Sequence, residues 1–375
     1  MKVFHCDHCG HLLFFENTQC LRCGRLAAFL PDLGLVGSLD AVDSTATATA
    51  TDNTENTDSN PTNKQGTWVS PLTAATGRTY RLCRNYTQFQ VCNWAVLSED
   101  PNPLCVSCRL TRVVPDLTSD ANRQAWYRLE VAKRRLIFTL LQLRLPIVDR
   151  EEDPQNGLAF EFKADNPSGE AVMTGHANGL ITVNIAEADD AERERRKASL
   201  HEPYRTLAGH MRHEVGHYYW DQLIALRNDH ERFRATFGDE RPDYGQALQN
   251  YYAGGPPSDW QNRFISAYSS AHPLEDWAET WAHYLHMVDT LETAAACGIS
   301  LRPRRNDEPA LPRVSPFVMS DDVAFDVLID SWFPVTYMLN NLNRGMGLPD
   351  AYPFVWSARA VEKLRFVHEL VQRVR

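Results

Sequence analysis

Apolar residues recur every three to four positions through most of the second half of the chain, which is the spacing of amphipathic helices. One such helix is expected from Asn122 to about Leu143, with Ser119 or Asp120 as its cap and Pro146 closing it. Further helical patterns cover about 189–199, 203–227, 274–291, 321–342 and 357–373. Shorter apolar and β-branched runs predict strands at Leu12–Phe15, Leu26–Leu30, Leu158–Phe162 and Gly179–Ile185.

The order of these elements indicates the fold class. Asn178-Gly179 is a hairpin signal that would join Val172–Thr174 to the strand at Gly179–Ile185. Strands followed by a run of helices predict an α+β fold for residues 113–375, and the helix around 203–227 is expected to open at Pro203. The N-terminal strands predict a small β module.

Cysteines give that module its chemistry. Of the nine in the chain, eight form two sets, and Cys297 stands alone as an expected small buried residue. The start of the chain lacks the apolar stretch of a signal peptide, so we expect a cytoplasmic protein with metal-bound thiolates rather than disulfides. The sets match two structural zinc sites, with the pairing between sets left open: Cys6, Cys9, Cys20 and Cys23, then Cys83, Cys92, Cys105 and Cys108.

Composition divides the chain further. Residues 1–36 are expected to form a zinc ribbon, and 69–112 a second four-cysteine segment. Between them, residues 37–68 are rich in threonine, alanine and asparagine, which predicts a flexible linker or inserted loop. A net charge of −10 argues against a general nucleic-acid binder, and no apolar run is long enough for a transmembrane helix.

The strongest chemical signal is the segment His213–His217, which reads His-Glu-Val-Gly-His. On a helix its two histidines lie one turn apart on one face and can hold one divalent metal ion. Glu214 lies between them, where it can take a proton from a metal-bound water. This is the HExxH arrangement of zinc hydrolases, chiefly metallopeptidases. Asp221 could orient a ligand histidine or be a surface carboxylate, whereas His210 is expected to be an ordinary core histidine.

A catalytic zinc site needs three protein ligands and an open position. A third histidine at the metzincin spacing would fall at Leu223, which excludes that class. The best candidates lie downstream, where Pro273 can open a helix that places Glu275 and Glu279 one turn apart on one face. One carboxylate can then bind zinc while the other holds a ligand histidine through its free ring nitrogen.

Together, the HExxH segment and Glu275-x-x-x-Glu279 resemble the gluzincin pattern. They are more similar still to the lethal-factor-like peptidases, which carry a tyrosine seven residues before the first glutamate, the place of Tyr268. The resemblance implies Glu275 as the third zinc ligand, Glu279 as its neighbouring support, and Tyr268 as stabiliser of the developing oxyanion. Most of the chain, including Glu202–Trp220, is also similar to a bacterial family that joins a zinc ribbon to a zinc-binding metallopeptidase domain. That resemblance implies a zincin-like, mainly helical domain at 113–375 and suggests that 44–57 is a local expansion.

The main hypothesis is therefore a zinc metallopeptidase with one catalytic and two structural zinc ions, acting on a protein or peptide. Glu214 would be the general base, and the strand at Leu180–Ile185 is expected to be an edge with which an extended substrate can pair. Two other hypotheses stay open. The chain could be a zinc-ribbon adaptor that binds a protein partner without cleaving it, or a hydrolase of non-peptide amides.

Overall fold

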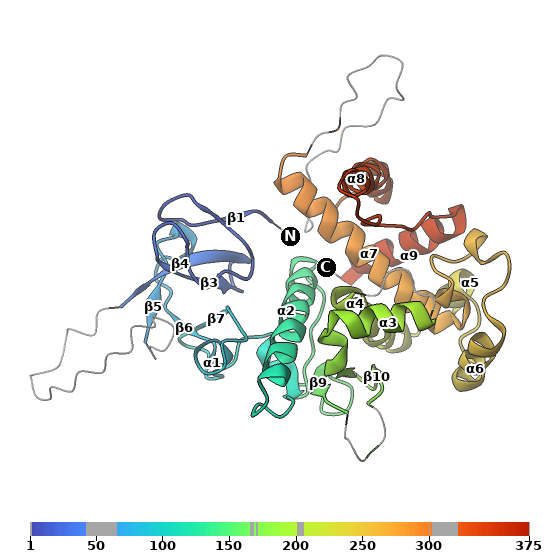
Figure 1. The fold of residues 1–375 in the computed structure, drawn as a ribbon, viewed down its shortest axis with the longest axis horizontal. Coiled ribbons are helices and arrows are strands. Elements are labelled where there is room, and N and C mark those ends of the chain that lie inside the picture. Colours follow the sequence, from blue (N-terminus) through green and yellow to red (C-terminus); the bar gives the residue numbers. More distant parts are fainter. Residues whose placement is uncertain are drawn as a thin grey trace, which may run out of the picture.

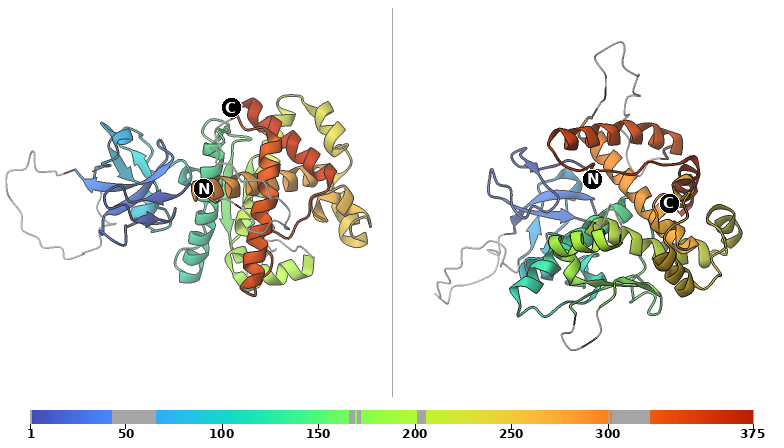
Figure 2. Two further views of the ribbon diagram at one scale, coloured as in Figure 1. Left: turned by 90° about the horizontal axis from the view of Figure 1, so that it is seen from above. Right: turned by 45° about the vertical axis from the view of Figure 1, so that its right-hand side comes forward.

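The computed structural model describes residues 2–42, 66–165, 169, 172–200, 206–299, 301 and 322–374, without the side chains of 196–200. These residues form a mixed α/β fold, with a small β-rich part at one end and a largely helical part at the other (Figures 1 and 2). No helix among them is long and apolar enough to cross a membrane. Pro203 and the threonine-rich stretch at 44–57 lie outside the described residues.

Short antiparallel strands build the β-rich part. Strands β1 (Phe4–His5) and β2 (Leu12–Leu13) pair with each other. The second sheet has the order β3 (Leu26–Leu30), β4 (Leu35–Ala41), β5 (Trp68–Val69), β6 (Tyr80–Leu82) and β7 (Ala95–Leu97). Strand β3 has the predicted bounds, but β4 continues past residue 36 to Ala41 and pairs with β5. Both cysteine-bearing segments therefore contribute to one sheet.

Helix α2 (Asp120–Gln142) lies between the two parts (Figure 1). Ser119 caps it by accepting a hydrogen bond from the Asn122 backbone N–H, as expected. Phe138 on α2 packs edge-on against Phe15 and Phe29 of the β-rich part, with ring centroids 5.3 and 5.6 Å apart. On the other side, the ammonium group of Lys133 lies over the rings of two phenylalanines of the helical part. One helix thus contacts both parts.

The helical part contains a four-stranded sheet in the order β10 (Gly175–Ala177), β11 (Leu180–Asn184), β9 (Ala159–Lys163) and β8 (Thr111–Val113). Asn178 and Gly179 form the hairpin turn between β10 and β11 with φ values of 49° and 78°, the positive values that such a two-residue turn requires. The first hairpin strand lies at 175–177 rather than 172–174. Because the hairpin places β10 outside β11, the expectation that Leu180–Ile185 is an edge strand is wrong, and the antiparallel edge is β10.

The helices follow the predicted positions closely. They are α3 (Asp190–Leu200), α4 (Leu207–Trp220), α7 (Pro273–Ala296), α8 (Phe325–Gly345) and α9 (Ala358–Val374). Helix α4 is shorter than expected because Thr206 caps its start and a π-helical turn, Asp221–Ala225, follows its end. Helices α5 (His230–Phe237) and α6 (Tyr244–Gly254) were not predicted. Cys297 ends α7 and is exposed, not buried, because the end of α7 extends beyond the core.

Helices α4 and α7 pack at unusually close range, which Gly216 permits. A Cβ at Gly216 would lie 3.0 Å from the Cα of Ala278 on α7. The bare backbone also lets the Gly216 carbonyl accept a 2.7 Å hydrogen bond from the indole N–H of Trp277. The glycine inside the HExxH segment therefore sets how near the histidines of α4 come to the carboxylates of α7.

Candidate metal centres

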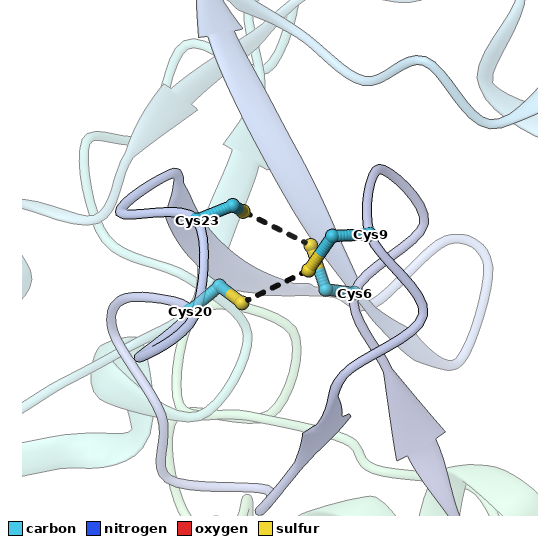
Figure 3. A group of neighbouring side chains, drawn as sticks. All are labelled: Cys6, Cys9, Cys20 and Cys23. Carbon is cyan, nitrogen blue, oxygen red and sulfur yellow. Dashed lines mark hydrogen bonds between the residues drawn. The ribbon is translucent and has the colours of Figure 1, made fainter.

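The first cysteine set converges on one point. The sulfur atoms of Cys6, Cys9, Cys20 and Cys23 face one another (Figure 3), with Cys6 and Cys23 3.7 Å apart and Cys9 and Cys20 3.6 Å apart. Four sulfurs held tetrahedrally about 2.3 Å from one zinc ion would lie about 3.8 Å from each other, whereas disulfide sulfurs lie about 2 Å apart. The separations fit a shared metal ion and exclude disulfides within this set.

Two glycines shape this site. Gly10 and Gly24 follow the second cysteine of each C-x-x-C pair, with φ of +69° and +73°. In that conformation each glycine N–H donates to the carbonyl of the first cysteine, Cys6 or Cys20. The chain turns back sharply, so both sulfurs of a pair point the same way.

The second cysteine set forms its own buried cluster: Cys83, Cys92, Cys105 and Cys108. Cys92 and Cys105 sulfurs lie 3.8 Å apart. The pairing left open by the sequence is thus uncrossed. Arg134 of α2 lies fully buried beside this set, and although burial disfavours its charge, Cys92 and its neighbours raise the pKa of the guanidinium. A positive charge here offsets the negative charge that four thiolates would bring. Both four-cysteine clusters fit structural zinc.

The third cluster joins α4 to α7. Nitrogen atoms of His213 and His217 and a carboxylate oxygen of Glu275 all lie within 4.8 Å of one another. Glu275 reaches both histidines: its Oε2 is 3.0 Å from His213 Nε2, and its Oε1 is 3.4 Å from His217 Nε2. The structure therefore brings together the three residues that the sequence nominated as ligands.

His213 stands between two carboxylates. Its Nδ1 lies 2.8 Å from Glu279 Oε1, and Glu279 is held in turn by the hydroxyl of Ser266 at 2.7 Å. Burial disfavours the charged imidazole, but Glu275 and Glu279 raise the pKa of His213 well above its usual value. A metal ion would compete with the proton at Nε2. Once that proton is displaced, the Nδ1–H still donates a hydrogen bond to Glu279, and Nε2 presents a lone pair beside the Glu275 carboxylate.

Several groups around this cluster gave no signal in the sequence. Tyr244 at the start of α6 donates a 2.5 Å hydrogen bond to Glu275 Oε1. His176 of β10 stacks at 6.0 Å over His217, and burial lowers the pKa of His176 to about 4. Asp243 caps α6 by accepting from the Gln246 N–H, an Asp-x-x-Gln pattern that could have revealed this helix.

The remaining predicted residues lie nearby. The ring of Tyr268 is 6.0 Å from that of His213, and burial raises the pKa of its hydroxyl. Asp221 stands in the π-helical turn after α4, where burial raises its pKa and His217 opposes that shift. Glu214 points to a different neighbour, His210, whose Nε2 is 3.2 Å from its Oε1.

Comparison with known proteins decides the family. Residues 122–370 match the family model described as "Putative zinc-binding metallo-peptidase", and residues 3–119 match a zinc-ribbon domain. The chain belongs to this metallopeptidase family. The matched metallopeptidase segment starts on α2 and contains both α4 and α7, while the ribbon match covers both cysteine sets.

Mycobacterial relatives extend the match to the whole length of this family member. Uncharacterized proteins of Mycobacterium bovis and of two Mycobacterium tuberculosis strains are each 43% identical to it over 375 residues, covering 100% of this chain and 96% of the relative. No solved structure matches the chain. The metallopeptidase family is thus established by sequence, and its chemistry has to be argued from the site.

Proposed function

We propose that the chain is a zinc-dependent peptidase whose catalytic ion is held by His213, His217 and Glu275. One observation carries this proposal: ligand atoms of two histidines and one carboxylate lie within 4.8 Å of one another, with buried Glu275 Oε2 3.0 Å from His213 Nε2. Two imidazoles and one carboxylate form a donor set that suits catalytic zinc and leaves a position for water.

Zinc in such a site lowers the pKa of a bound water towards about 7 and polarises a substrate carbonyl. Glu214, buried beside the ligands, accepts the proton of the attacking water and passes it to the leaving amine. A carboxylate suits this task because burial, which raises the pKa of Glu214, is outweighed by the neighbouring histidines, which lower it. The base is therefore ionised before the reaction begins.

Three side chains support the reacting centre. Tyr268 keeps its proton because burial raises its pKa, so its hydroxyl can donate to the oxyanion of the tetrahedral intermediate. Glu279 fixes the orientation of His213 through Nδ1. Asp221 acts electrostatically on His217 from the turn behind it.

The substrate of this proposal is a protein or peptide. Among the described residues, strand β10 is an edge strand of the four-stranded sheet, and its His176 stacks on His217. An extended peptide added to β10 would run past the proposed ligands, as pairing at a sheet edge requires. We propose a zincin-like arrangement on this basis. The ribbon would serve structure or partner recruitment, and free, metal-grouped cysteines favour a reducing compartment such as the cytoplasm.

The decisive experiment uses a peptide library with the purified protein, a chelator and added zinc. Glu214→Gln should keep full zinc content and lose hydrolysis, whereas His217→Ala should lose the catalytic zinc as well. Undiminished hydrolysis by Glu214→Gln would refute the mechanism. Zinc binding by the wild type without hydrolysis of any peptide would favour the non-cleaving adaptor.

A further inference from the structure

His210 lies one turn before His213 on α4, outside the group of proposed ligands, and faces a carboxylate on each side. Its Nδ1 is 2.5 Å from Glu187 Oε2, and its Nε2 is 3.2 Å from Oε1 of Glu214, the proposed base. The expectation of an ordinary core histidine is therefore incomplete. Each ring nitrogen of His210 thus faces a carboxylate.

Glu187 anchors this arrangement in the sheet. Its side chain is only 1% exposed, and its Oε1 accepts a 2.6 Å hydrogen bond from the Thr174 hydroxyl. That hydroxyl accepts in turn from the Asn184 backbone N–H at the end of β11. Glu187 also lies in the 3-10 turn Ile185–Ala188, where its carbonyl accepts from Arg193. The fixed carboxylate of Glu187 thus holds Nδ1 of His210.

The contact with Glu214 involves one of its two carboxylate oxygens. His210 Nε2 lies 3.2 Å from Glu214 Oε1. An N–H at Nε2 can donate to that oxygen while Oε2 takes the proton of the attacking water.

We infer that Glu187 and His210 are positioning residues that hold the carboxylate of Glu214 in the orientation needed for general-base catalysis. The inference rests on the proposed function, in which Glu214 takes the proton. A base oriented by a third group recurs wherever a proton must be taken at a fixed distance, and a misplacement of about 1 Å can cost about 10²-fold in rate.

The first test does not depend on activity. Crystal structures of the zinc-loaded wild type and of His210→Ala should show the Glu214 carboxylate in one orientation in the former and displaced or in several orientations in the latter. The catalytic zinc content should be the same in both proteins. An unchanged carboxylate in His210→Ala would overturn the inference whatever the enzyme hydrolyses.

Kinetics supply the second test. His210→Ala should lower kcat about 10²-fold with KM nearly unchanged. Glu187→Gln keeps an oxygen that accepts from His210 and should retain most of kcat. Glu187→Ala should lower kcat about as much as His210→Ala does. His368→Ala is the matched control, because His368 is also a buried histidine, bonded to Tyr284 and to the Val323 carbonyl. It should lose stability and keep kcat.

The outcomes separate the two claims. Wild-type kcat in His210→Ala, or equal losses in both Glu187 variants, would overturn the positioning role. A zinc-loaded wild type that hydrolyses no peptide, together with a displaced Glu214 in His210→Ala, would overturn the proposed function and leave the positioning of Glu214 in place.

Discussion

Tyr244 and Glu275 are 31 residues apart in the sequence, yet the hydroxyl of one donates to the carboxylate of the other. At the scale of single residues, the site is made by such contacts as much as by the motif. This hydrogen bond fixes which way Oε1 of Glu275 points. Groups that orient a metal ligand in this way affect metal affinity strongly.

Tyr244→Phe should therefore weaken catalytic zinc binding about 10- to 100-fold, the usual cost of losing a hydrogen bond to a ligand. Competition with a fluorescent chelator measures the affinity. Tyr337→Phe is the matched control, since Tyr337 is 63% exposed on α8, and it should bind zinc as the wild type does. Equal affinity of the two variants would show that Tyr244 does not orient Glu275.

A second residue-scale prediction concerns pH. His283 on α7 is buried and bonded to the Tyr352 hydroxyl, and burial lowers its pKa to about 4. The unfolded chain, with a pKa near 6.5, takes up this proton first, so stability is lost as the pH falls from about 6.5 to 4. The difference between the pKa of about 4 in the folded protein and that of about 6.5 in the unfolded chain corresponds to about 3 kcal/mol in the free energy of unfolding. Urea unfolding at several pH values should show a shallower acid loss for His283→Asn, and an identical slope would contradict this assignment.

At the scale of elements, the packing of α4 against α7 sets the distances between the proposed ligands. Gly216→Ala would place a methyl group 3.0 Å from the α7 backbone and should cost about 1–3 kcal/mol by overpacking, with weaker catalytic zinc binding. Urea unfolding and zinc titration measure both effects. Gly254→Ala on α6, where a Cβ meets nothing within 4 Å, should be neutral or slightly stabilising. A neutral Gly216→Ala would mean that α4 and α7 can separate freely.

The elements also show what the sequence could and could not reveal. His213, His217, Glu275 and Glu279 follow local helical spacing, so their faces were predictable, and the structure brings them together. Tyr244, Ser266 and Glu187 arrive from segments without apolar periodicity, and only tertiary packing brings them to the site. The order of strands is likewise not local: the Asn178-Gly179 hairpin signal predicts a partner on one side of Leu180–Ile185, but nothing local reveals the parallel pairing with β9 on the other side.

At the scale of the whole molecule, the three metal clusters formed by the described residues predict three zinc ions per chain. Elemental analysis of the intact protein should give about three for the wild type and about two for either His217→Ala or Cys20→Ser. At low temperature, only His217→Ala should lose peptidase activity, because a zinc site closed by four cysteines leaves no open position for substrate. A wild type with two zinc ions, unchanged in His217→Ala, would remove the catalytic site from the proposal.

The pairing of β4 with β5 has a consequence for how chain length can vary in this family. Asp40 and Ala41 lie opposite Val69 and Trp68, and the Val42 N–H donates to the Thr67 carbonyl, so the ends of the stretch at 43–65 are already closed on each other. The entropic contribution to the free-energy cost of closing a loop rises only by about 0.6 kcal/mol per doubling of its length. Insertions and deletions at this one position should therefore leave the sheet nearly as stable as before, so relatives can differ in length here without a change in strand pairing.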